Sequence, residues 1–380
     1  MTSPEIAEEV LDDAELLRAR DPRGLLPAVA GAGAQVRETA RLTTEAGLDR
    51  VTDGGRPRGL IIVARREGAV AAAVLRALLG PGSPVTVDVV PGPALPVWAG
   101  PSDIAVVATR TGAGRYAVAP AYEAARRGVA LVGIGAEDSP LRGACAGARA
   151  PYVPLPESRV RQTTLWSLLT PMLQLATGLE LLPAGVADLD TVAAALDEIA
   201  AECGPAQDSF VNPAKTLALE LLDALPVIAA EGPLASAAAG RVADQLATLA
   251  GLPVTGFRLP EQRVAACAVL GGPLAPRADD DFFRDRAEDP GRRLRLLTVR
   301  DLDAGAPYGA GEREPRSATE GMEQVLRTAA AHGVPVSGLA EHADPARYGR
   351  LAGLARQLAV ADFTAVYLAL ALDRERATGS

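Results

Sequence analysis

Two blocks of short apolar segments, separated by helix-like stretches, constrain the fold of this 380-residue chain more than any other feature. In the first block these segments are 59–64, 85–90, 103–109 and 129–134, with sequences such as GLIIVA and DIAVVAT. Strands that are apolar on both faces and alternate with helices are typical of a parallel sheet covered on both sides. The first block therefore predicts a doubly wound α/β domain, to which 151–155 adds a fifth strand.

The second block repeats this alternation. Its expected strands are 225–229, 253–257, 266–271, 294–299 and 334–337, and its expected helices are 235–250, 317–331 and 346–372. A mainly helical bridge is expected at 159–178 and 188–202. We therefore expect two tandem doubly wound parallel-sheet domains, with these bounds: N-terminal helical segment 1–50, first domain 51–157, helical bridge 158–208, and second domain 209–380 with a C-terminal helix.

The composition excludes several classes of function. The formal net charge is −9, and no basic stripe interleaved with aromatic residues occurs, so we expect no nucleic-acid partner. Three widely spaced cysteines and two histidines predict neither a metal site nor a bound cofactor. The N-terminus has no apolar signal-peptide core, and the apolar run 358–372, which contains Asp362, is too short to span a bilayer. We expect a cytoplasmic protein with no membrane partner.

The loop after the first strand, ARREGA, places two arginines where ligands bind in open parallel sheets. Such sheets bind ligands where the carboxyl ends of strands lead into helix N-termini, whose free N–H groups attract phosphate. Arg65 and Arg66 either bind an anion there or form a solvated charged turn. Both interpretations stay open.

The loop after the third strand, TRTGAGRY, is a second candidate for anion binding. Thr109 and Thr111 offer hydroxyl groups, and Gly112 and Gly114 permit a tight turn into the next helix. A plain strand-to-helix turn would explain the same residues. The predicted ligand-binding residues are therefore these four together with the two arginines of the first loop.

Three segments resemble a known family: AGRVADQLATLAGLPVTGFRLPEQRVAA at 239–266, NPAK at 212–215 and VRQTTLW at 160–166. In outline they are similar to bacterial phosphoglucose/phosphomannose isomerases of the SIS (sugar isomerase) type. The resemblance implies two SIS domains across most of 59–372, a phosphosugar ligand and a homodimer. Asn212 and Pro213 also suit a helix start on structural grounds alone.

The family's catalytic positions hold unreactive residues in this chain. The resemblance aligns the family's base Glu with Thr248 and its ring-opening His with Val264, and neither side chain exchanges protons near neutral pH. Arg161 matches the arginine that stabilises negative charge developing on the sugar, although it also suits a surface position. Glu261 is either a substitute base or a turn residue. The family's C-terminal catalytic lysine has no counterpart here.

Two functions follow from this pattern. The first is a catalytically degenerate SIS protein that binds a sugar phosphate or a partner protein in a regulatory role. The alternative is an active aldose–ketose isomerase, of the glucose-6-phosphate/mannose-6-phosphate type, that uses other acid and base residues. A third hypothesis is a structural subunit that pairs with an active isomerase. The sequence leaves open whether the chain is an enzyme.

Overall fold

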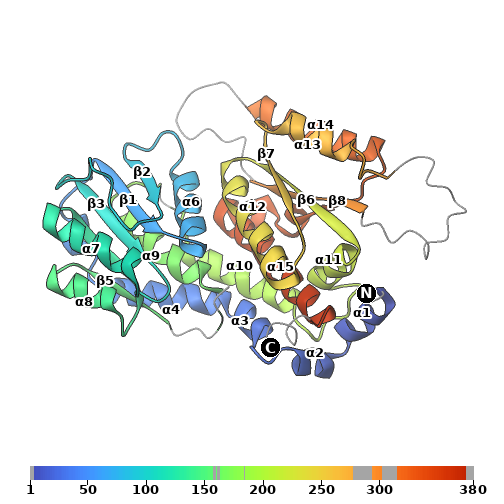
Figure 1. Ribbon diagram of the computed structural model, residues 1–380, viewed down its shortest axis with the longest axis horizontal. Coiled ribbons are helices and arrows are strands. Elements are labelled where there is room, and N and C mark those ends of the chain that lie inside the picture. Colours follow the sequence, from blue (N-terminus) through green and yellow to red (C-terminus); the bar gives the residue numbers. More distant parts are fainter. Residues whose placement is uncertain are drawn as a thin grey trace, which may run out of the picture. The chain divides into compact units, whose positions relative to one another are not determined.

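A computed structural model describes residues 4–156, 160, 163–183, 185–276, 293–301 and 315–373. The chain divides into two compact units, one of residues 31–194 and one of residues 1–30 with 195–380. Each unit contains one parallel sheet flanked by helices, so the predicted α/β class is confirmed (Figure 1). The domain bounds expected from the sequence remain a prediction.

The unit of residues 31–194 contains a five-stranded sheet of order β2-β1-β3-β4-β5, in which all neighbours are parallel. Its strands are β1 (Gly59–Ala64), β2 (Thr86–Val90), β3 (Asp103–Ala108), β4 (Ala130–Ala136) and β5 (Tyr152–Leu155). Its helices are α4 (Ala32–Glu45), α5 (Asp49–Thr52), α6 (Glu67–Leu79), α7 (Arg115–Arg127), α8 (Pro140–Gly147) and α9 (Leu165–Gly178). All five strands predicted in this block are present.

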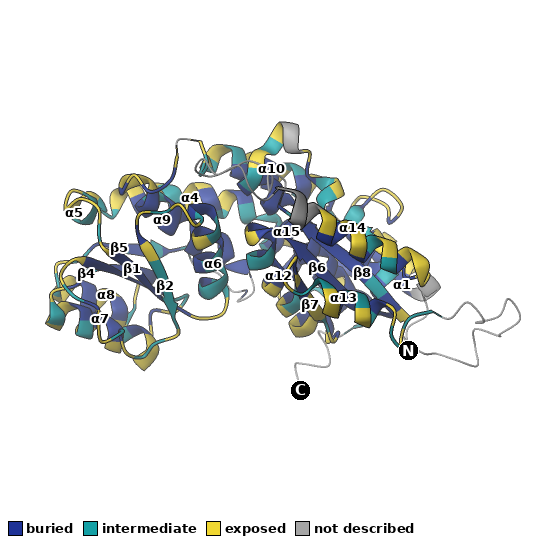
Figure 2. Ribbon diagram, turned by 90° about the horizontal axis from the view of Figure 1, so that it is seen from above, coloured by how far each residue is buried: buried dark blue, intermediate teal, exposed yellow. Residues whose placement is uncertain are grey.

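The central strands β1 and β3 are buried along their whole length, as their continuous apolar sequences predict. One face of the sheet packs on α7 and α8, where Ile61 and Val107 meet Ala121 and Leu141 in one core cluster. Helices α6 and α9 lie on the opposite face (Figure 1). Exposed residues gather on the outer surfaces of the helices (Figure 2). The sheet is therefore covered on both sides, as a parallel sheet requires.

The second unit has a four-stranded parallel sheet of order β7-β6-β8-β9. Its strands are β6 (Ala224–Glu231), β7 (Thr255–Leu259), β8 (Arg293–Arg300) and β9 (Val336–Gly338). Its helices are α1 (Pro4–Asp12), α2 (Ala14–Arg20), α3 (Leu25–Ala30), α11 (Pro213–Leu221), α12 (Pro233–Gln245), α13 (Arg263–Leu270), α14 (Pro315–Ala331) and α15 (Pro345–Ala371). A π-helical turn, Leu246–Ala250, extends α12, and a 3-10 turn, Leu339–His342, precedes α15. Helix α10 (Leu189–Glu202) crosses the boundary between the units.

One predicted strand of the second block is wrong. Residues 266–271, expected as a strand, belong to α13 and its C-cap, Gly271. The sequence RVAACAVL is rich in alanine, the strongest helix former, and Ala266 and Leu270 are buried four residues apart on one helical face. A short apolar run has the same composition in a buried strand and in a short helix, so its periodicity alone does not distinguish them.

Helix α15 is the central helix of its unit. Its segment Arg347–Ala371 is long and apolar enough to cross a membrane, but its most apolar window is fully buried inside the protein, as in the core helix of a folded domain. Asp362 lies on this helix and accepts hydrogen bonds from Arg241, at 2.6 and 3.2 Å, and from Gln245, at 3.1 Å. The pair of charges is almost completely buried. It joins α15 to α12.

The buried carboxylate of Asp362 predicts a strong effect on stability. We expect Asp362→Asn to lower the free energy of unfolding by about 3 kcal/mol, because it removes the charge that compensates a buried guanidinium. Glu323→Gln, in an ion pair that is mostly exposed, is the matched control and should change it by less than about 0.5 kcal/mol. Urea unfolding followed by circular dichroism measures both. Similar values for the two variants would contradict a stabilising role of the buried pair.

Candidate functional site

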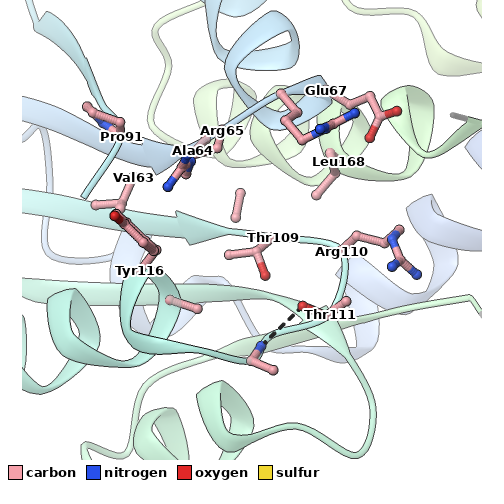
Figure 3. Close-up of a pocket in the computed structure, with 14 residues that line it drawn as sticks. Val63, Ala64, Arg65, Glu67, Pro91, Thr109, Arg110, Thr111, Tyr116 and Leu168 are labelled. Atoms are coloured by element: carbon pink, nitrogen blue, oxygen red, sulfur yellow. Dashed lines mark hydrogen bonds between the residues drawn. The ribbon is translucent and has the colours of Figure 1, made fainter. Parts of the chain in front are cut away.

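A cavity of about 330 Å³ lies at the carboxyl edge of the first sheet, where β1 and β3 end. Figure 3 shows the side chains around it. They come from the ends of β1 and β3 and the loops that follow them, from Pro91 after β2, from the first turns of α6 and α7, and from Leu168 of α9. The lining residues are Val63, Ala64, Arg65, Arg66, Glu67, Pro91, Ala108, Thr109, Arg110, Thr111, Ala113, Tyr116, Ala117 and Leu168. The volume lies at the lower end of the range of small-molecule sites, about 300–1,000 Å³.

The β3–α7 loop turns tightly beneath the cavity. Thr109 Oγ1 accepts a hydrogen bond from the Gly112 amide at 2.8 Å, and the Ala113 amide points to Thr111 Oγ1 at 3.4 Å (Figure 3). Gly114 has φ +82° and caps α7 without a side-chain hydrogen bond. The Ala117 and Val118 amides donate to the Gly114 carbonyl, whereas the amides of Arg115 and Tyr116, the first two of α7, have no side-chain cap, and the helix dipole adds a partial positive charge. This loop can bind an anion.

Gly112 fixes this turn because no larger residue fits there. Its φ is +59°, and a Cβ atom would lie 2.4 Å from Ser139 Oγ. Ser139 Oγ in turn lies 2.8 Å from the hydroxyl of Tyr152, which donates a hydrogen bond to the Ala136 carbonyl at 2.6 Å. Burial raises the pKa of Tyr152 above its usual value, so the phenol stays protonated as a donor. A packed floor thus supports the turn.

The β1–α6 loop contributes two arginines and one carboxylate. The guanidinium of Arg65 lies 4.3 Å from the ring centroid of Tyr116, in a cation–π contact between the two loops. Arg66 has φ +53° and ψ −126°, a conformation that side chains of L-residues rarely adopt and that costs about 1–3 kcal/mol. Glu67 accepts a hydrogen bond from Thr164 at 3.1 Å. Strain of this kind clusters at ligand sites.

The structure brings together most of the ligand-binding residues predicted from the sequence. Arg65, Arg66, Thr109 and Thr111 line the same cavity, and Gly112 and Gly114 shape the loop that carries the threonines. Three further lining residues with polar or charged groups, Arg110, Tyr116 and Glu67, are not among the ligand-binding residues predicted from the sequence. Arg110 stands between the two threonines, and Tyr116 lies one turn further on, so the loop sequence itself contained the signal. Nothing in the sequence indicates the hydrogen bond that Thr164 donates to Glu67.

Thr248 and Val264, which the resemblance aligns with the family's base and ring-opening histidine, belong to the unit of residues 1–30 and 195–380. Thr248 is exposed on the π-helical turn and donates to the Asp244 carbonyl. Val264 is 74% exposed on α13, and Glu261 is exposed in the turn before that helix. Arg161 lies outside the described residues.

The NPAK segment has the structural role that its sequence indicates. Asn212 caps α11 by accepting hydrogen bonds from the amides of Ala214 and Lys215. The Lys215 ammonium is buried and donates to the Pro205 and Gln207 carbonyls, at 3.0 and 2.7 Å. Burial lowers its pKa, and the carboxylate of Asp12 opposes this shift. Lys215 is a structural residue of α11.

The described residues include no group of three or more histidine, cysteine or acidic side chains placed to hold a metal ion. The chemistry that the cavity offers is therefore that of guanidinium groups, hydroxyls, backbone amides and one carboxylate. These groups recognise a phosphate together with hydroxyl groups of a small ligand.

Comparison with known proteins agrees with this class of fold. Residues 210–375 match the family model described as the bacterial phospho-glucose isomerase C-terminal SIS domain. The sequence has no match among curated proteins. Each unit has a parallel sheet flanked by helices, the fold class that the solved structures below share. The match to the family model covers residues 210–375, so the similarity to SIS domains at the level of sequence lies in the second unit.

Solved structures share the fold over nearly the whole chain. A presumptive phosphosugar isomerase from Silicibacter pomeroyi is 17% identical with a TM-score of 0.59, covering 92% of this chain and 98% of that one. A hypothetical protein from Thermus thermophilus is 15% identical with a TM-score of 0.60, covering 97% and 88%. The C-terminal domain of glucosamine-fructose-6-phosphate aminotransferase from Francisella tularensis is 11% identical with a TM-score of 0.54, covering 92% and 96%. At these identities the likeness shows the fold alone.

The packing around Gly112 predicts that its replacement distorts the site. We expect Gly112→Ala to lower the free energy of unfolding by about 2 kcal/mol, since a Cβ atom meets Ser139 and the backbone is left-handed. Gly143→Ala is the control: it lies in α8 of the same unit with open space around it, and should stabilise the protein by about 0.5–1 kcal/mol. Thermal unfolding of the two variants measures the difference. A Gly112→Ala protein as stable as the parent would show that the turn is not constrained as described.

Proposed function

We propose that the protein binds a sugar phosphate in the cavity at the carboxyl edge of β1 and β3 and does not isomerise it. It acts as a sugar-phosphate-binding or regulatory protein, cytoplasmic and homodimeric. One observation supports this most directly: the loop from Thr109 to Gly114 keeps a phosphate-type turn, whereas the family's acid and base positions hold Thr248 and Val264.

The phosphate would bind at the N-terminus of α7. There the backbone amides and the helix dipole attract the anion, and Thr109 and Thr111 add hydroxyl donors. Arg110 lies between these threonines and lines the same cavity, so its guanidinium supplies charge-assisted hydrogen bonds. The carboxylate of Glu67 faces the cavity from the β1–α6 loop and accepts hydrogen bonds from sugar hydroxyls.

The absence of isomerisation follows from the proton transfers that the reaction needs. Moving a proton between C1 and C2 of the sugar requires a base, and ring opening requires an acid. The Thr248 hydroxyl already donates to a backbone carbonyl, and Val264 has no exchangeable proton. Glu261, the alternative base, is an exposed residue of the turn before α13. Binding without turnover is the consistent interpretation.

A panel of sugar phosphates tests this proposal. We expect at least one of glucose 6-phosphate, mannose 6-phosphate, fructose 6-phosphate and glucosamine 6-phosphate to raise the unfolding temperature, because a ligand at one hundred times its Kd stabilises the folded state by about 2.7 kcal/mol. Inorganic phosphate is the reference for binding of the anion alone. No thermal shift with any member would contradict the proposal and favour a structural subunit instead.

The Thr109 hydroxyl provides the matched pair of variants. Thr109→Val should weaken binding of the sugar phosphate by about tenfold or more, since a hydrogen bond to a charged group contributes about 1.5–3 kcal/mol. Thr109→Ser keeps the hydroxyl and should bind like the parent protein. Coupled assays of glucose-6-phosphate and mannose-6-phosphate isomerisation on the purified parent protein should detect no turnover. Turnover that disappears in Glu261→Gln would establish the active isomerase instead.

A further inference from the structure

The cavity contains more positive charge than a single phosphate group needs. Among its described lining residues three are arginines, Arg65, Arg66 and Arg110, and one is an acid, Glu67, so these residues carry a formal charge of 3 − 1 = +2. The N-termini of α6 and α7 add partial positive charge at the same edge of the sheet. The whole chain, in contrast, has a net charge of −9.

These arginines have no carboxylate partner within ion-pair distance among the described residues. Arg65 instead stacks on Tyr116, which holds its guanidinium at the cavity between the two loops (Figure 3). In the second sheet the corresponding edge is neutralised. There Arg300, at the end of β8, pairs with Glu231, at the end of β6, at 2.6 Å. Next to them Arg350 makes two hydrogen bonds to Asp301, at 2.6 and 3.0 Å.

The two edges are equivalent in topology, because β6 lies between β7 and β8 as β1 lies between β2 and β3. At the second edge the arginines near the strand ends have a structural role, and each is neutralised by a carboxylate. At the first edge the arginines are left to meet an anion from outside.

The backbone of Arg66 is a second, independent observation. Its φ of +53° and ψ of −126° belong to a region that glycine adopts easily and arginine does not. Glycine at this position would relieve the backbone strain. The presence of arginine there therefore indicates a function of its side chain. The residue lines the cavity and is exposed to solvent. Binding of an anion is the function that a guanidinium serves at such a place.

The β1–α6 and β3–α7 loops thus form two anion subsites from two neighbouring strands. Thr109, Arg110 and Thr111 form one, and Arg65 and Arg66 form the other. We propose that the ligand is a sugar phosphate carrying a second anionic group, either a carboxylate or another phosphate. The first group binds at α7 and the second at the paired arginines. This inference rests on the proposed function, since it names the class of sugar phosphate that the cavity takes.

Titration calorimetry with three probes tests the ligand class: glucose 6-phosphate, 6-phosphogluconate and fructose 1,6-bisphosphate. At least one doubly anionic probe should bind about tenfold or more tightly than glucose 6-phosphate, as one added charge-assisted contact provides. The two doubly anionic probes distinguish a carboxylate from a second phosphate. Glucose 6-phosphate binding as tightly as both would overturn this inference and leave the proposed function intact. No binding of any probe would overturn both.

Arg66→Gly tests the assignment to this loop. The preference for the doubly anionic probe should fall about tenfold, while the unfolding temperature of the free protein rises because the strained backbone is relieved. Arg76→Ala removes an arginine from the same helix that does not line the cavity, and should leave the preference unchanged. A preference that survives Arg66→Gly would show that the second anion binds elsewhere. The rise in unfolding temperature separates a lost contact from a misfolded variant.

Discussion

The parallel pairing of β1 with β3 is the constraint on which the site depends. The two strands pair in register from Gly59 opposite Asp103 to Ala64 opposite Ala108, so both end at the same level. Each strand must then turn into a helix on a covered face, which directs the N-termini of α6 and α7 toward one edge. Backbone amides from two helices and side chains from two loops therefore meet in one cavity, where the Arg65–Tyr116 contact joins the two loops.

The apolar pattern predicted this framework because burial on both faces leaves a clear signature. The segment GLIIVA corresponds to β1 without a shift, and the two candidate loops after β1 and β3 do line one cavity. The pattern failed at 266–271, where a short alanine-rich run has the same appearance in a strand and in a helix. It gave no indication of the strain at Arg66 or of the hydrogen bonds of Asp362 to Arg241 and Gln245, since these depend on backbone angles and on packing between distant segments.

The electrostatic role of arginine could be assigned only from the structure. Lysine occurs once in the chain, so the number of arginines at first indicates a bias of composition more than a function. Whether an arginine pairs with a carboxylate distinguishes the arginines that serve the fold from those that can bind a ligand. Arg241 and Arg300 lie beside buried carboxylates, whereas Arg65 contacts an aromatic ring at the cavity and has no carboxylate within ion-pair distance in the described part of the chain. A guanidinium that is paired with a carboxylate serves the fold. A guanidinium that faces a cavity without such a partner can bind an anionic ligand.

The two sheet edges of this chain thus represent two uses of the same topology. At the second edge Glu231 and Asp301 occupy the strand ends where a ligand would bind. They form ion pairs with Arg300 and Arg350 and so neutralise the charge of these two arginines. At the first edge the strand ends carry Ala64 and Ala108, whose small side chains leave room for the cavity. Thr248 and Val264, which the resemblance aligns with the family's base and ring-opening histidine, lie on the π-helical turn and on α13. The proposed ligand binding therefore needs only residues of the first unit, and its groups come from segments of the chain other than those that hold Thr248 and Val264.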